Sequence, residues 1–209
     1  MATNYRKPPT KLTVGAQYIC FNRMDENNDW TQSFEDTVYQ LPTVTNVEVS
    51  DNTDAYDTYA SGDVYESDAA ITGVEISETN IAFPDDLLER MRGNDVDDGV
   101  VLGGGIGMRP YFAYGFVVKK RDNTMDLRWY PKCKLTDNSD KTETSEESHK
   151  DQTDDLTIKA YGFDEKSHKY VRALTAEEGM QDVTEEAFFA APLLTAAAVK
   201  ALVSETPGE

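Results

Sequence analysis

Basic side chains are absent from one long segment of the chain. Between Met24 and Glu89 the sequence contains seventeen Asp and Glu residues and no Lys, Arg or His. The whole chain has 39 acidic and 20 basic residues, so the other segments hold 22 acidic residues against those 20 bases. Nearly all of the formal net charge of −19 therefore comes from this acidic segment. Nucleic acid is also a polyanion, so such a surface repels it, and a nucleic-acid reader is not expected.

Long apolar runs and cysteines are also scarce. No run reaches the roughly 18 apolar residues of a membrane span, and the polar start, Met1–Thr10, lacks the apolar centre of a signal peptide. The two cysteines, Cys20 and Cys133, lie in apolar, strand-like segments, which favours two buried free thiols, with a disulfide as the alternative. These features predict a protein without a membrane partner that folds in the cytoplasm.

Motifs for catalysis or cofactor binding are missing as well. The two histidines, His149 and His168, are far from both cysteines and lack zinc-ligand spacing. Gly103–Gly107 is not followed by the Lys-Ser/Thr of a phosphate loop, and a strand is expected after it rather than a helix. In Asn94–Gly99, a calcium-loop frame would place Val96 at a ligand position. We therefore expect no metal, no cofactor and no enzymatic activity.

The hydrophobic pattern predicts a mainly β protein. Apolar and polar residues alternate in Val44–Ser50 and Ile71–Glu78, as in half-buried strands, and Tyr111–Val118 is apolar on both faces, as in a central strand. Phe83–Gly93 has an early Pro, two acidic residues in its first turn and a closing Gly, which predicts one short helix. The expected fold is an antiparallel β-sandwich or barrel with extended N- and C-terminal arms.

The length of 209 residues fits one domain. We expect an N-terminal arm at residues 1–11, a β body at 12–173 and a C-terminal helical arm at 174–209, with its helix broken at Pro192. Two polar connections are expected within the body, at Asp51–Gly62 and at Asn94–Gly107.

One basic cluster follows the central strand. The simpler interpretation of this cluster is a hairpin that its charges keep soluble and whose lysines also discourage edge-to-edge pairing. The sharper interpretation is a patch that meets the acidic segment of a neighbouring copy, because complementary faces on one subunit favour head-to-tail assembly into rings or filaments. The cluster consists of Lys119, Lys120, Arg121, Arg128, Lys132 and Lys134.

Three stretches of sequence together carry a resemblance to a known family. They are Tyr59–Tyr65 with the following strand and helix up to Gly93, then Pro110–Leu135, and then the Thr/Glu-rich stretch that leads into Asp155–Gly162. In this order they resemble the major tail proteins of long-tailed bacteriophages, over roughly residues 10 to 165. Type VI secretion tube proteins share that fold, so the fold alone does not separate the two.

The resemblance implies a β-sandwich subunit that forms hexameric rings. Rings would stack into a tube around a tape-measure protein, between baseplate or initiator proteins and a tail terminator. Phage DNA would later pass through without specific binding. The tube would be assembled in the host cytoplasm and end as part of the virion tail.

The resemblance also implies roles for named residues. Placed in a ring, one polar strand face would line an anionic lumen, along which DNA could slide. A protruding loop would stack on the next ring through its aromatic residues, and the C-terminal arm would anchor on neighbouring subunits. The candidates are Glu48, Ser50, Glu75 and Ser77 for the lumen, Asp51, Asp54, Tyr56, Asp57 and Tyr59 for stacking, and Phe188, Phe189 and Leu193 for the arm.

The expected function is therefore that of a structural tail-tube subunit. One alternative is a tube protein of a contractile or type VI-like injection machine, and another is a head–tail connector or terminator ring. A third alternative is a glycan-binding β-sandwich module, for which Trp30 is the candidate aromatic platform.

Overall fold

The structure is a computed structural model and describes residues 7–60, 63–104, 107–139 and 153–204, of which 54–60, 63–70, 138 and 204 are described by their backbone only. The strands and helices are β1 (Lys11–Phe21), β2 (Tyr39–Leu41), β3 (Val44–Ala60), β4 (Asp63–Asn80), α1 (Asp85–Arg92), β5 (Asp95–Asp97), β6 (Val100–Leu102), β7 (Phe112–Lys120), β8 (Met125–Ser139), β9 (Asp154–Ala160), β10 (Val171–Leu174), α2 (Glu185–Phe189) and α3 (Ala196–Ser204).

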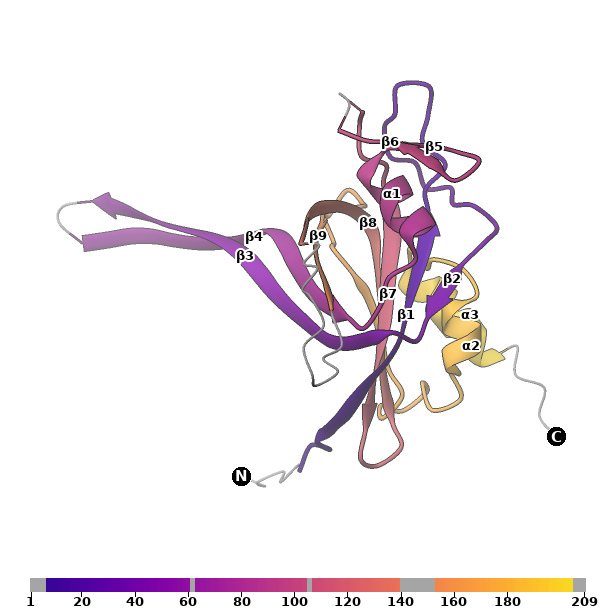
Figure 1. The fold of residues 1–209 in the computed structure, drawn as a ribbon. Coiled ribbons are helices and arrows are strands. Elements are labelled where there is room, and N and C mark those ends of the chain that lie inside the picture. The colour runs from indigo at the N-terminus through magenta and orange to yellow at the C-terminus, as the bar shows by residue number, and fades with distance from the viewer. Residues whose placement is uncertain (1–6, 61–62, 105–106, 140–152, 205–209) are drawn as a thin grey trace, which may run out of the picture.

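Most strands belong to one antiparallel sheet. Its order is β2–β1–β7–β8–β9–β4–β3, and β10 pairs with the first half of β8. β2 and β3 form the two edges, so the described strands make an open sheet rather than a closed barrel (Figure 1). The expected mainly antiparallel β fold is confirmed.

The central strand β7 is buried along nearly its whole length, as its apolar faces predict. One face packs into a first core, with side chains from β1, β4, β8, β9 and α1. The other face packs into a second core, beneath the C-terminal helices that Figure 1 shows beside β1. Both cysteines are free and buried, as predicted, and burial raises the pKa of the Cys20 thiol to about 11.

A β-bulge lets β8 serve both cores. Tyr114 of β7 pairs with Tyr130, but Phe112 pairs with Cys133, so two residues of β8 stand opposite one residue of β7. The extra residue reverses which face each later side chain points to. Trp129 therefore lies in the second core, whereas Cys133 lies in the first.

The internal helix has the predicted ends. Pro84 precedes α1, Asp85 and Asp86 occupy its first turn, and Gly93 ends it in the left-handed region with φ 77°. Its apolar side chains Leu87, Leu88 and Met91 are buried in the first core.

The predicted loop at Asp51–Gly62 is wrong. β3 continues through this stretch to Ala60 and pairs with β4 from Val44 onward, which makes one long hairpin that projects from the sheet (Figure 1). Asp is unfavourable in strands, so the composition indicated a loop, but cross-strand pairing overrides that weak preference. The expected connection at Asn94–Gly107 likewise contains the short β5–β6 hairpin.

The C-terminal segment forms two helices, α2 and α3, and the break between them includes Pro192, as predicted. The arm interpretation of its anchors is wrong. Phe188 is 0 % exposed and Phe189 is 3 % exposed in the second core, where Leu193 also packs. The physical reason is that β7 is apolar on both faces, so its second face needs a cover, and this chain's own C-terminal segment provides it. Of the N-terminal arm, residues 7–10 are described, and they form an irregular segment before β1.

Candidate functional site

The four lumen candidates lie on one face of the β3–β4 hairpin. Glu48 pairs with Ser77 across the two strands, and Ser50 pairs with Glu75. The alternating residues of β3 and β4, among them Val49 and Ile76, point into or against the first core, so the predicted alternation is confirmed. Their exposure to a lumen stays a prediction.

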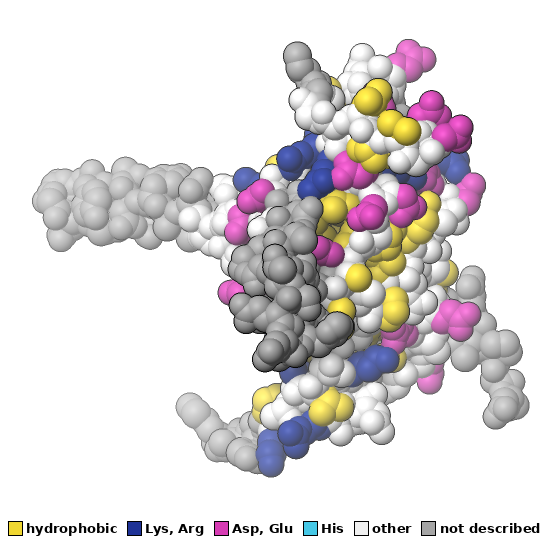
Figure 2. Space-filling model, viewed as in Figure 1, with side chains coloured by type: hydrophobic (Ala, Val, Ile, Leu, Met, Phe, Trp, Pro, Cys, Tyr) yellow, Lys and Arg dark blue, Asp and Glu magenta, His cyan; other side chains and the backbone are white. Residues whose placement is uncertain are grey.

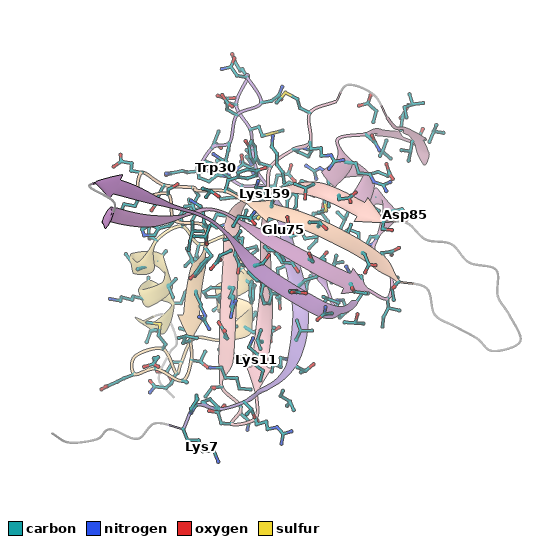
Figure 3. All side chains as sticks on the ribbon, turned by 90° about the vertical axis from the view of Figure 1, so that its left-hand side faces the viewer. Lys7, Lys11, Trp30, Glu75, Asp85 and Lys159 are labelled. Atoms are coloured by element: carbon teal, nitrogen blue, oxygen red, sulfur yellow. The ribbon has the colours of Figure 1, made fainter. Side chains whose placement is uncertain are left out.

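Lysines continue the same face on the next two strands. Glu75 pairs with Lys159 of β9, and Lys159 pairs with Lys134 of β8. Gly73 makes room for this row, because a Cβ there would lie 3.2 Å from Lys159 Cε. Figure 3 places Glu75 and Lys159 close together where the hairpin leaves the body. We call this surface the outer face; its acidic part lies on β3 and β4 and its basic part on β9 and β8.

Aromatic rings support the basic part of the outer face. The Lys134 ammonium lies 4.0 Å from the centroid of the Tyr111 ring, and the Lys159 ammonium lies 5.8 Å from that of Tyr161. The Lys132 ammonium lies 5.2 Å from the Trp30 ring and 5.4 Å from the Tyr111 ring. The lysine–aromatic face consists of Lys132, Lys134, Lys159, Trp30, Tyr111 and Tyr161, all partly buried.

Sequence reasoning missed this face because its aromatic members come from three separated segments. The Trp30 indole N–H donates to the carbonyl oxygen of Pro131 at 3.3 Å, which ties the β1–β2 loop to β8. Trp30 is therefore engaged by β8 and covered by Lys132, which does not favour the free platform that a glycan-binding module needs.

The predicted basic cluster is not one patch. Lys119, beside the β7–β8 turn, forms an ion pair with Glu185 of α2 at 3.3 Å. Arg128 is turned toward Asp126 and the Phe116 ring. Lys119 pairs with Met125 at the start of β8, and Lys132 follows Met125 by seven residues on that strand. At the usual rise of a strand, Lys119 and Lys132 are therefore about 23 Å apart. The cluster therefore divides among three environments.

The acidic segment does not form one surface either. Glu35 pairs with Arg90 at 2.5 Å, and Asp36 pairs with Arg23 at 2.8 Å. Arginines that flank the segment in sequence thus neutralise part of it. Among the stacking candidates, Asp51 is exposed on β3, whereas the side chains of Asp54, Tyr56, Asp57 and Tyr59 lie outside the described residues.

One carboxylate of the acidic segment is buried. Glu78 is 2 % exposed because it lies on the same face of β4 as Val74 and Ile76. The alternation of Ile71–Glu78 in the sequence therefore indicates that this carboxylate is buried. The Tyr114 hydroxyl donates to Glu78 Oε2 at 2.5 Å, and Asn80 Nδ2 donates to Oε1 at 3.2 Å. Burial raises the pKa of Glu78 to about 7, against the effect of these two hydrogen bonds. The cluster joins β4 to β7 across the first core.

Glu78→Gln is expected to change how stability depends on pH. The folded carboxyl keeps its proton up to about pH 7, whereas the unfolded one loses it from about pH 4.5. The folded state therefore binds more protons in this window, and the wild type loses stability relative to the variant as pH rises through it, by at most about 3 kcal/mol. Urea unfolding of both proteins from pH 4 to 8 measures the difference. Glu75→Gln on the outer face is the matched control, and parallel profiles for wild type and Glu78→Gln would refute the assignment.

A pocket of about 550 Å³ lies between α1 and the β5–β6 hairpin, beside the glycine-rich stretch. Arg109 in its wall donates to the carbonyl oxygens of Leu135 and Thr136, and Arg92 pairs with Glu89, so both guanidinium groups are engaged by the chain itself. Across the described part of the chain, no group of three or more His, Cys, Asp or Glu side chains is arranged to hold a metal ion.

The β5–β6 hairpin is a second exposed surface. Val100 is 61 % exposed and Leu102 is 70 % exposed, and Val96, Val101 and Met108 are exposed beside them. Hydrophobic and acidic side chains gather in this part of the face shown in Figure 2. Exposed apolar side chains that lie together typically mark a contact surface.

No protein-family model matches the chain, and no curated protein matches it. In the described residues, no helix has the length and apolar character that crossing a membrane requires.

Proposed function

We propose that this chain is a structural subunit that assembles with copies of itself into a tube of stacked rings, as the resemblance to major tail proteins of long-tailed bacteriophages implies. The tube would hold a tape-measure protein and then conduct DNA. The observation that supports this proposal best is the projecting β3–β4 hairpin.

Much of this hairpin has no partner within the described strands. β4 pairs with β9 from Val74 to Asn80, whereas from Asp63 to Gly73 it pairs with β3 alone. At the usual rise of a strand, this two-stranded part extends about 35 Å. A two-stranded hairpin by itself is at best marginally stable in water. Contact with another copy would cover it and stabilise it, which a subunit of an assembly provides.

The proposal gives the two parts of the outer face different roles. The acidic part, with Glu48 and Glu75, would line the lumen, where carboxylates give DNA no counterion-release attraction. The basic part, with Lys134 and Lys159, would lie against a neighbouring copy, where its charge is neutralised. The charge row along the outer face supports this division.

Negative-stain electron microscopy of the concentrated protein tests the proposal. We expect hollow tubes or stacked rings. Single closed rings that never stack would favour a connector or terminator ring, and separate particles at every concentration would contradict self-assembly.

Shortening the hairpin is expected to abolish stacking without unfolding the subunit. Replacing residues 55–69 with Asn-Gly joins the paired residues Asp54 and Ala70 through a two-residue turn and leaves the pairing of β4 with β9 intact. Sedimentation velocity and electron microscopy should show folded subunits that form no tubes, because the surface for the next copy is gone. Tubes of normal length from this variant would exclude a stacking role.

A further inference from the structure

Three lysines of the outer face contact aromatic rings rather than carboxylates among the described side chains. Within the described residues, Lys132, Lys134 and Lys159 contact aromatic rings and form no ion pair with a carboxylate. By contrast, Lys119 and Arg23 each have a carboxylate partner. The three ammonium groups therefore form a cationic surface with Glu75, the pairing partner of Lys159, at its edge.

The surroundings of these lysines hold them in place. Each ammonium lies over a ring, and Trp30 is fixed to β8 by its hydrogen bond to Pro131. Gly73 leaves space for the stem of Lys159. Side chains that are already ordered lose less conformational entropy when they bind, so this surface is prepared for an anionic partner.

We propose that the lysine–aromatic face binds the acidic β3–β4 hairpin of a second copy of this chain. The projecting part, residues 54–70, contains five acidic residues and no basic ones, so its charge complements that of the face. The hairpin projects from the sheet in Figure 1, and its unpartnered part, about 35 Å long, is long enough to cross a neighbouring subunit. Lys159 lies at the root of the hairpin (Figure 3), and Lys134 is its pairing partner on β8. Each copy can therefore receive one hairpin and offer its own, which is a head-to-tail contact.

The observations favour a carboxylate-rich protein surface over nucleic acid as the occupant. Single-stranded nucleic acid binds such surfaces by stacking bases on open aromatic rings. Here lysines cover the rings, and the net charge of −19 opposes the approach of a polyanion. An acidic hairpin from a neighbouring copy needs no open ring for stacking. It also brings fewer negative charges to the surface than a nucleic-acid strand does.

Charge reversal gives the first test. Lys134→Glu/Lys159→Glu should weaken self-association about tenfold at low salt, since each reversal replaces an attraction with a repulsion. The effect should shrink at high salt, where screening is strong. The control, Lys166→Glu/Lys200→Glu, makes the same charge change at two exposed positions elsewhere and should leave association near that of the wild type. Sedimentation equilibrium measures the constants, and circular dichroism verifies that both variants are folded.

Cross-linking and a charge swap give the second test. A carbodiimide joins lysine to carboxylate without a spacer, and mixing ¹⁴N- and ¹⁵N-labelled protein identifies links between copies. We expect links from Lys132, Lys134 or Lys159 to the hairpin acids Asp54, Asp57, Asp63, Glu66 or Asp68. Adding Asp54→Lys/Asp57→Lys to the reversed variant should restore association.

The inference rests on the proposed function only in taking a second copy as the partner, and the two can fail separately. Tubes without these links, with equal association of the reversed and control variants, would overturn the inference alone. Linked dimers that never form rings or tubes would support the inference and count against the tube.

A lysine reversal that abolishes binding of single-stranded DNA but leaves self-association unchanged would overturn the inference in favour of a nucleic-acid site. No self-association under any condition would overturn both.

Discussion

Replacing Asp126 with Ala is expected to lower the free energy of unfolding by about 3–5 kcal/mol. The Asp126 side chain is 2 % exposed and accepts hydrogen bonds from Arg128 at 2.8 Å and from Arg172 at 2.5 Å. Removing the carboxylate leaves two guanidinium groups side by side on β8 and β10 without their shared partner. Urea unfolding at neutral pH measures the loss.

The matched control is an ion pair that is open to water. Asp36 is 95 % exposed in its pair with Arg23, so Asp36→Ala should cost less than about 1 kcal/mol. Burial alone would raise the pKa of Asp126, but the hydrogen bonds from Arg172 and Arg128 outweigh burial and hold that pKa below its usual value. The contribution of Asp126 is therefore present at neutral pH and is lost as the pH falls below the ordinary range of an Asp. Equal costs for the two variants would show that the buried pair contributes no more than an exposed one.

Phe189→Ala is expected to lower the free energy of unfolding by about 3–5 kcal/mol. The Phe189 ring stacks on Tyr18 with centroids 3.9 Å apart and meets Trp129 edge-on at 5.3 Å. Gly115 admits this ring, because a Cβ there would lie 2.7 Å from Phe189 Cε1. The variant would leave a cavity at the centre of the second core that rigid neighbouring strands cannot close.

Leu193→Ala is the control. Leu193 is only partly buried against the same core, so this variant should lower the free energy of unfolding by about 1 kcal/mol. Thermal unfolding at several protein concentrations separates the two roles of the C-terminal segment. A loss of stability that is independent of concentration supports a core role. Normal subunit stability with impaired assembly would instead restore Phe189 as an anchor on a neighbouring copy.

Local patterns in the sequence predicted much of the fold. The alternation in Val44–Ser50 and Ile71–Glu78, the apolar β7 and the helix signals of Phe83–Gly93 each correspond to an observed element. These signals depend on near neighbours in the chain, which is why they can be read without a structure.

The remaining features depend on pairing between distant segments. The hairpin replaces a predicted loop because β4 supplies partners for the Asp-rich half of β3. The burial of Phe188 and Phe189 could not be predicted, because amphipathicity does not tell which chain covers an apolar face. The lysine–aromatic face combines a loop, the bulged strand β8 and β9, so no single stretch of sequence announces it. The apolar residues on both faces of β7, which predict a central strand, also indicate that a second core covers its other face.

The bulge in β8 also constrains the evolution of this chain. Pro131 and Lys132 together stand opposite a single residue of β7. Losing one of them would exchange the inward and outward positions beyond it, which would drive Lys134 toward the interior and Cys133 toward water. Homologues that share this architecture should therefore tolerate changes of residue type at this point but no insertion or deletion. The spacing between Tyr130 and Cys133 is then a sharper marker of descent than the identity of either residue.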